Sequence, residues 1–187
     1  MENNAVAIVT GSVAQVPQDQ QERLGIRVIP FTIQLNGKSY LDDGSAISAT
    51  EIYRIMRTSD ALPTTAAPSS GEYISTIQSL FEEGYKDIVY ISLSEKLSSD
   101  YTVACGIAEA LTKQNSGHRV YVYDSMSAAV AQGFLAIEAA ERAERGETVQ
   151  QILHWLDEAK SRAGLVACVD SLKYLARTGR IGKASKF

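Results

Sequence analysis

Short runs of apolar residues alternate along the chain with longer segments in which apolar residues recur at helical spacing. A continuous apolar run of four to six residues is typical of a strand that is buried on both faces. Five segments predict strands, of which two are interrupted by a polar residue, Arg27 or Ser92: residues 6–9, 26–29, 88–93, 120–123 and 165–169. The segments between them predict helices, so the pattern predicts an α/β protein with a mostly parallel sheet and helices on both faces.

Residues 62–68 read Leu-Pro-Thr-Thr-Ala-Ala-Pro and precede an apolar-periodic segment. Each proline disfavours helix in the residue before it, so we expect residues 64–67 to form an extended, tight loop. Such a loop would direct the hydroxyls of Thr64 and Thr65, with free backbone N–H groups, toward an anion. A capped structural turn is the alternative.

Three segments carry the capping-box signature of a helix start, a hydroxyl residue followed three positions later by Glu or Gln. A long helix is predicted from residue 127 to 145, and its small and apolar composition predicts that it is largely buried. The capping pairs are Ser48 with Glu51, Ser69 with Glu72, and Thr148 with Gln151.

Residues 31–35 alternate in polarity and are followed by Asn36-Gly37, a strong hairpin signal, so we expect a hairpin at a sheet edge. The loop after it contains Asp42 and Asp43. A solvated turn is the better interpretation than a metal site, because no third ligand lies nearby in the sequence. We expect neither a metal nor a cofactor.

The chain has 187 residues and a net charge of −4, which argues against a nucleic-acid-binding protein. No apolar run approaches the length needed to span a membrane, and the first residues lack a signal-peptide pattern. We therefore expect a cytoplasmic protein without stable membrane insertion. Cys105 and Cys168 fall on faces that we expect to be buried, which predicts two reduced thiols.

Hydroxyls and one carboxylate follow three of the predicted strands. In open parallel sheets, ligands bind beyond the carboxyl ends of the strands, where the loop with Thr64 and Thr65 can join them. Neutral donors and helix N-termini suit a carboxylate or phosphate. The strand-end residues are Thr10 and Ser12, then Ser94, Ser98 and Ser99, then Asp124 and Ser125.

Catalytic motifs are missing from the sequence. It contains no Gly-x-Ser-x-Gly elbow, no phosphate-binding loop and no dinucleotide fingerprint. Neither His118 nor His154 is placed to activate a strand-end serine. A binding protein is favoured over an enzyme. One alternative is an enzyme, a transferase or hydrolase with Ser98 or Ser99 as nucleophile and Asp124 as base. Another is a defective or regulatory relative of such binding proteins that only binds a partner.

Six segments together resemble the DegV family, bacterial lipid-binding proteins that hold a long-chain fatty acid and present its carboxylate to a fatty acid kinase. The resemblance implies an acyl tail in an apolar tunnel between two domains, with the carboxylate bound by Thr64, Thr65 and Ser98. Ser99 lies beside them, and Thr10, Ser12, Asp124 and Ser125 would form a supporting rim. The segments are residues 5–12, 24–30, 62–69, 91–99, 122–125 and 177–183.

The chain departs from the family pattern at several positions. The family's Thr-Asp-Ser is Thr-Gly-Ser at 10–12, its Thr-Thr-Ser-Gln-Pro is Thr-Thr-Ala-Ala-Pro at 64–68, and its Leu-Ser-Gly-Thr is Leu-Ser-Ser-Asp at 97–100. Asp100 adds a negative charge that would weaken carboxylate binding unless it points away.

Family members also continue beyond the segment at residues 177–183. We therefore expect an N-terminal α/β domain over residues 1–163 and an incomplete second domain over 164–187. An exposed tunnel wall would then favour a homodimer.

Overall fold

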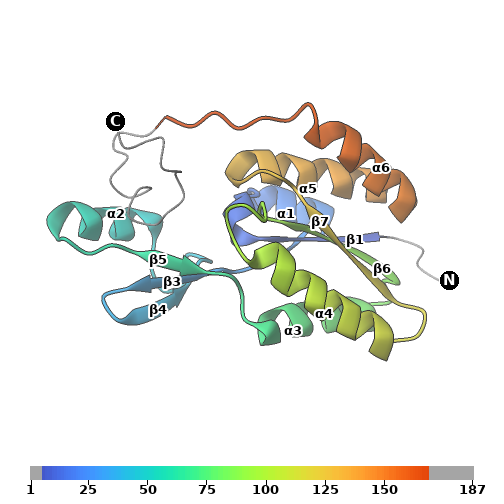
Figure 1. The fold of residues 1–187 in the computed structure, drawn as a ribbon, viewed down its shortest axis with the longest axis horizontal. Helices are drawn as coiled ribbons and strands as arrows, with labels where there is room; N and C mark the ends of the chain where they lie inside the picture. Colours follow the sequence, from blue (N-terminus) through green and yellow to red (C-terminus); the bar gives the residue numbers. More distant parts are fainter. Residues whose placement is uncertain (1–5, 169–187) are drawn as a thin grey trace. The chain divides into compact units, whose positions relative to one another are not determined.

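The computed structural model describes residues 6–168, and the chain divides into two compact units. Of the described residues, 6–31 and 67–165 belong to the larger unit, and 32–66 and 166–168 belong to the smaller one. Figure 1 shows the elements of each unit. The described part contains no helix with the length and apolar character needed to cross a membrane.

The larger unit contains a four-stranded parallel sheet in the order β2-β1-β6-β7. Its strands correspond to four of the five strand segments predicted, and helices lie between them along the chain. The predicted β-α-β unit is present, since β1 and β2 pair in parallel and α1 (Gln18–Leu24) lies between them in the sequence. The strands are β1 (Val6–Gly11), β2 (Arg27–Ile29), β6 (Asp87–Ser92) and β7 (Arg119–Asp124).

Helices cover both faces of this sheet, which confirms the predicted fold class. Helices α1 (Gln18–Leu24), α5 (Ala129–Glu144) and α6 (Val149–Lys160) lie on one face, and the short 3-10 helix η1 (Ser12–Ala14) packs against α5. On that face Ile8 and Ile91 of the sheet pack with Leu135, Ile152 and Leu156.

The opposite face is covered by α3 (Ser70–Glu82) and α4 (Asp100–Gln114) (Figure 1). Val9 and Ile88 pack there with Tyr73, Leu80 and Leu111. Burial on both faces explains why these strands are continuously apolar in the sequence.

The smaller unit contains an antiparallel sheet in the order β4-β3-β5 and the helix α2 (Ala49–Thr58). Its strands are β3 (Thr32–Leu35), β4 (Lys38–Leu41) and β5 (Thr64–Ala66). The predicted hairpin is present, with φ of 51° at Asn36 and 75° at Gly37 as a type I′ turn requires. Its strand β4 lies at an edge, as predicted, and the sheet to which it belongs is separate from the parallel one.

Residues 64–66 are extended, as the flanking prolines predict, but they form a strand and not a free loop. Thr64 lies opposite Gln34, and Thr65 lies opposite Ile33, so β5 completes the edge of β3. Extended residues next to an open strand edge pair with it because both sets of backbone groups then gain hydrogen bonds.

The strand predicted at residues 165–169 is wrong over its described part. Residues 165–168 have no regular secondary structure and are exposed, as is the thiol-bearing Cys168. A strand requires a neighbour for its backbone hydrogen bonds, and none pairs with these residues in the described part. Residue 169 and the segment 177–183 lie outside the described residues, and the domain boundary at residue 163 stays a prediction.

The predicted helix starts are present, and two of them are complete capping boxes, at Ser69 and at Thr148. Ser48 caps α2 by accepting the backbone N–H of Glu51, and the Glu51 carboxylate binds Arg54 instead of completing a capping box.

The prediction that the long helix is buried holds for one face of α5 only. Phe134 is 69% exposed, because α5 packs on the sheet through Leu135, Gln132 and its small residues and turns the face with Phe134 outward.

Candidate functional site

Strands β1 and β6 meet at the point where the strand order of the parallel sheet reverses. From β1 the chain moves outward to β2, whereas from β6 it moves in the other direction to β7. In open α/β sheets, ligands bind outside the carboxyl ends of the strands at such a point. We therefore describe the groups at the ends of β1, β6 and β7 as the candidate site.

Thr10 lies at the end of β1, and its side chain is fully buried. Its hydroxyl donates to the carbonyl of Ile91 at 2.8 Å and accepts from Gln132 Nε2 at 3.0 Å. The same Gln132 nitrogen donates to the Ile91 carbonyl at 3.2 Å. Thr10 therefore joins β1, β6 and α5, and direct contact between its hydroxyl and a ligand stays a prediction.

Ser12 follows β1, and its Oγ accepts the backbone N–H of Phe31 at 3.0 Å. Gly11 lies between Thr10 and Ser12, at the position where the family pattern has Asp. A Cβ on Gly11 would lie 2.6 Å from the ring of Phe31, so that ring occupies the space that a side chain would need. The glycine and the phenylalanine ring thus fit one another.

Asp124 and Ser125 at the end of β7 connect the loops of this edge. Asp124 Oδ1 accepts the backbone N–H groups of Met126 at 2.9 Å and of Glu95 at 3.3 Å. Ser125 is buried, and its hydroxyl donates to the carbonyl of Ser127 and accepts the Ser127 N–H. Asp124 therefore joins the loops after β6 and β7, and Ser125 supports the loop after β7 from within.

Ser98 and Ser99 end the loop between β6 and α4. Ser98 is partly exposed, and its Oγ accepts the backbone N–H of Asp100 at 3.2 Å. Among the described residues no acceptor takes the Ser98 hydroxyl proton, so this hydroxyl can donate to a ligand. Ser99 is exposed at the start of α4, and its side chain makes no capping bond.

Asp100 does not place its charge on the surface of the site. Its side chain is fully buried, where Oδ1 accepts the hydroxyls of Tyr73 and of Tyr90, the latter at 2.7 Å. Oδ2 accepts the backbone N–H of Leu93 at 2.9 Å. Burial raises the pKa of Asp100 above its ordinary value. Burial and the Asp100 charge raise the pKa of both tyrosines, which therefore remain protonated donors.

Thr64 and Thr65 belong to the smaller unit, and both are exposed on β5. Successive side chains of a strand point to opposite faces. Thr65 therefore shares a face with Ile33, and Thr64 shares the other face with Gln34. The two hydroxyls do not point the same way, as the predicted loop required, and their approach to the strand ends of the larger unit stays a prediction.

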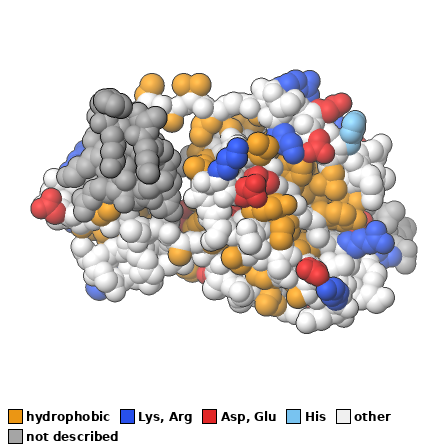
Figure 2. All heavy atoms as spheres, in the orientation of Figure 1, with side chains coloured by type: hydrophobic (Ala, Val, Ile, Leu, Met, Phe, Trp, Pro, Cys, Tyr) orange, Lys and Arg blue, Asp and Glu red, His pale blue; other side chains and the backbone are white. Residues whose placement is uncertain are grey.

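Large apolar side chains are exposed on the same side of the larger unit as the loops. They begin in the loops after β6 and β7 and continue along α5. Figure 2 shows hydrophobic side chains gathered on this unit, with charged groups around them. The exposed residues are Leu97, Met126, Val130 and Phe134.

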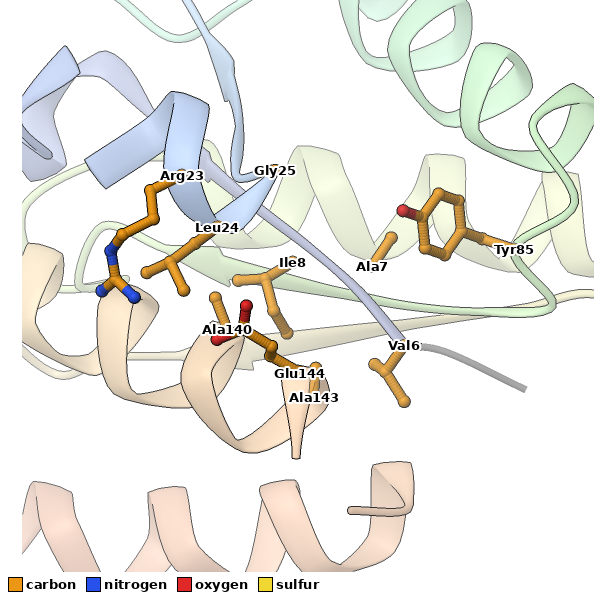
Figure 3. Close-up of a pocket in the computed structure, with 10 residues that line it drawn as sticks. All are labelled: Val6, Ala7, Ile8, Arg23, Leu24, Gly25, Tyr85, Ala140, Ala143 and Glu144. Atoms are coloured by element: carbon orange, nitrogen blue, oxygen red, sulfur yellow. The ribbon is translucent and has the colours of Figure 1, made fainter. Parts of the chain in front are cut away.

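A groove of about 430 Å³ between α5 and α6 continues the apolar surface of α5. Its walls include Phe134, Leu135 and Trp155. Another cavity, of about 190 Å³, lies at the opposite end of β1, between Ile8, Leu24 and Tyr85 (Figure 3). No residue of the candidate site lines it, so we do not assign the ligand to that cavity.

Sequence reasoning missed the polar residues that support the site. Gln132 is the polar member of an otherwise small and apolar helix segment, and that pattern is the signal that would have found it. Its Oε1 is buried without a partner in the described part. Tyr73 and Tyr90 carry no such signal, because tyrosines are common in strands and at buried helix positions.

The geometry contains no activated serine among the described residues. Ser98 binds a backbone N–H, and Asp124 also binds backbone N–H groups. His154 lies on α6 beside Glu158, and His118 packs against Phe81. A nucleophile needs a base within hydrogen-bond reach, so the arrangement favours binding over covalent chemistry.

These features define an open, doubly wound α/β protein with a hydrogen-bonding edge at its strand ends. The DegV family model, described as that of an uncharacterised protein, matches residues 5–187, and the chain belongs to the DegV family.

Relatives in the family are longer than this chain. A DegV domain-containing protein of Listeria monocytogenes is 35% identical over 182 residues, which are 97% of this chain and 62% of that protein. One from Staphylococcus aureus is 31% identical over 94% of this chain and 60% of its own length. The chain thus spans about three fifths of the relatives that it matches.

Solved structures of family members have the same fold. One from Thermus thermophilus, described as showing fatty acid binding, has a TM-score of 0.85 at 32% identity and covers 96% of this chain and 62% of its own. DegV of Bacillus subtilis, described as a fatty acid binding protein, has a TM-score of 0.82 at 27% identity, covering 94% and 61%. A stearic acid-binding protein of Eubacterium ventriosum gives 0.82 at 25% identity, covering 97% and 62%.

Proposed function

We propose that this protein binds a long-chain fatty acid, with the carboxylate at the strand-end site. The observation that carries the proposal is the Ser98 hydroxyl, which is partly exposed and keeps its proton available beside the ends of β6 and β7. Fatty-acid-binding structures with the same fold support the choice of ligand.

The chemistry of this edge suits a carboxylate head group held by hydrogen bonds. A carboxylate only accepts hydrogen bonds, so it needs donors such as the Ser98 O–H and backbone N–H groups. Burial of an acyl tail supplies most of the affinity, at about 0.8 kcal/mol per methylene. The head-group bonds would then fix the orientation of the lipid.

We assign one of the two β5 threonines to the same head group. Because Thr64 and Thr65 lie on opposite faces of β5, a ligand in one place meets the side chain of only one of them. Thr64→Ala and Thr65→Ala should therefore differ, with one variant weakening binding and the other leaving it unchanged.

Presentation of the bound carboxylate to a fatty acid kinase is the second part of the proposal. The kinase would transfer the γ-phosphoryl group of ATP to a carboxylate oxygen, giving an acyl phosphate and ADP. The protein itself would hold the lipid and carry out no chemistry, in the cytoplasm where ATP is present. Acyl phosphate formation by the purified kinase should therefore depend on addition of this protein.

Formation of a homodimer stays a prediction.

Titration of the purified protein with palmitate, monitored by calorimetry, tests the binding claim. Ser98→Ala should weaken binding by roughly 10- to 100-fold, since it removes a hydrogen bond to a charged group. The matched control is Ser75→Ala, which removes an exposed hydroxyl on α3 that binds only the carbonyl of Glu72. Equal affinities for the two variants would contradict the proposed site.

A further inference from the structure

The carboxyl group of Asp100 is a hydrogen-bond centre buried directly behind the loop that carries Ser98. It accepts from Tyr73 on α3, from Tyr90 on β6 and from the backbone of Leu93 after β6. Helix α3, the end of β6 and the start of α4 therefore meet at one side chain. All three partners are donors, which fits an ionised carboxylate.

The surroundings of Asp100 make its charge unfavourable for the stability of the folded protein. The side chain is fully buried, and among the described residues it makes no ion pair with a cation. A second acid, Asp124, also acts to raise the pKa of Asp100. A buried charge without a cation is unfavourable unless hydrogen bonds compensate it.

Asp100 fixes both ends of the loop at residues 94–99. Its carboxylate holds the N–H of Leu93, immediately before the loop, and its own backbone N–H donates to Ser98 Oγ at the end of the loop. Because the Asp100 N–H occupies one lone pair of the Ser98 oxygen, the hydroxyl proton of Ser98 turns away from Asp100.

We propose that Asp100 is the positioning residue of the head-group site, acting through Leu93 and Ser98 to direct the Ser98 hydroxyl proton at the ligand carboxylate. The inference rests on the proposed fatty acid function and adds to it the residue that sets head-group selectivity. Asp100 itself does not touch the ligand.

The test compares two ligands with the same tail, palmitate and hexadecanol, by displacement of a fluorescent fatty acid. A positioning role predicts that Asp100→Asn lowers the ratio of palmitate to hexadecanol affinity by about tenfold, the effect of one charged hydrogen bond. The amide of Asn cannot accept from Leu93 and from both tyrosines at once. A purely structural role would weaken both ligands equally and leave the ratio unchanged.

A double-mutant cycle with Ser98→Ala shows whether Asp100 acts through Ser98. In the Ser98→Ala background, Asp100→Asn should lower the ratio no further. Tyr90→Phe, which removes one donor to Asp100 and keeps the ring, should lower the ratio by a smaller factor. Its matched control is Tyr85→Phe, at a tyrosine that lines the cavity at the other end of the sheet. The two tyrosine variants keep the test available if Asp100→Asn does not fold.

Each outcome separates the two claims. An unchanged ratio in Asp100→Asn and Tyr90→Phe, or additive effects in the cycle, overturns the positioning role and leaves the proposed function standing. Wild-type protein that binds neither ligand, or binds both equally, overturns the proposed function and the positioning role with it.

Discussion

Burial of Asp100 makes the stability of the larger unit depend on pH. Tyr73 from α3, Tyr90 from β6 and Asp124 from β7 are the titratable groups that face it. Since its pKa is raised above the ordinary value of 3.8, the folded protein binds the proton more tightly than the unfolded chain does. The stability gained from this tighter proton binding is fully present below pH 3.8, and it is lost as pH rises through the raised pKa of Asp100.

Comparison of the wild type with Asp100→Asn isolates this effect, because Asn does not titrate. The free energy of unfolding of the wild type, relative to the variant, should fall as pH rises from 3.8 to the raised pKa of Asp100. Between those two pKa values, this free-energy difference falls by about 1.4 kcal/mol per pH unit. Urea unfolding at a series of pH values measures it. A difference that stays constant or rises would contradict the account.

The residues of the site were predictable from the sequence to different degrees. Ser98 follows directly from its place after a buried strand, and the structure leaves its proton available. The direction of the Asp100 side chain was not predictable, because it depends on Tyr73, 27 positions away in the sequence. Patterns over a few neighbouring residues identify strand ends, whereas buried polar networks form through tertiary packing of residues that are far apart in the sequence.

At the scale of elements, the approach of α5 to η1 depends on Gly133. A Cβ at this position would lie 2.3 Å from the carbonyl oxygen of Ala14, a backbone atom that cannot move aside easily. Gly133→Ala should lower the free energy of unfolding by about 1–3 kcal/mol, the usual effect of overpacking. Urea unfolding monitored by circular dichroism checks this value.

Gly106 on α4 supplies the matched control for the same chemical change. An added Cβ there meets no atom within 4 Å, and the position is exposed. Gly106→Ala should therefore raise stability by about 0.5–1 kcal/mol, through the better helix propensity of alanine. If both variants were stabilised, the described contact between α5 and η1 would be wrong.

Elements with local signals were predicted well, and elements that depend on a partner were not. Capping boxes located the starts of α3 and α6, and Asn36-Gly37 located the turn between β3 and β4. The pairing of β5 with β3, and the lack of regular structure at residues 165–168, depend on whether a neighbouring strand is available. That information is not local in the sequence.

At the scale of the molecule, the two sheets should differ in local stability. Strands β1 and β6 are almost fully buried between two layers of helices, whereas β4 and β5 are mostly exposed. Amide hydrogen exchange should therefore be slower in β1 and β6 than in β4 and β5 by about two orders of magnitude or more. The central strand β3 should be intermediate. Equal protection in the two sheets would contradict this description.

The central claim is that the protein holds a fatty acid by its carboxylate, and native mass spectrometry of protein purified from a bacterial host tests it most directly. Denaturing extraction then identifies the bound compound. The account predicts a co-purified mass that matches a long-chain fatty acid, reduced in Ser98→Ala and retained in Ser75→Ala. Protein that carries no lipid and takes up none when palmitate is added would contradict it.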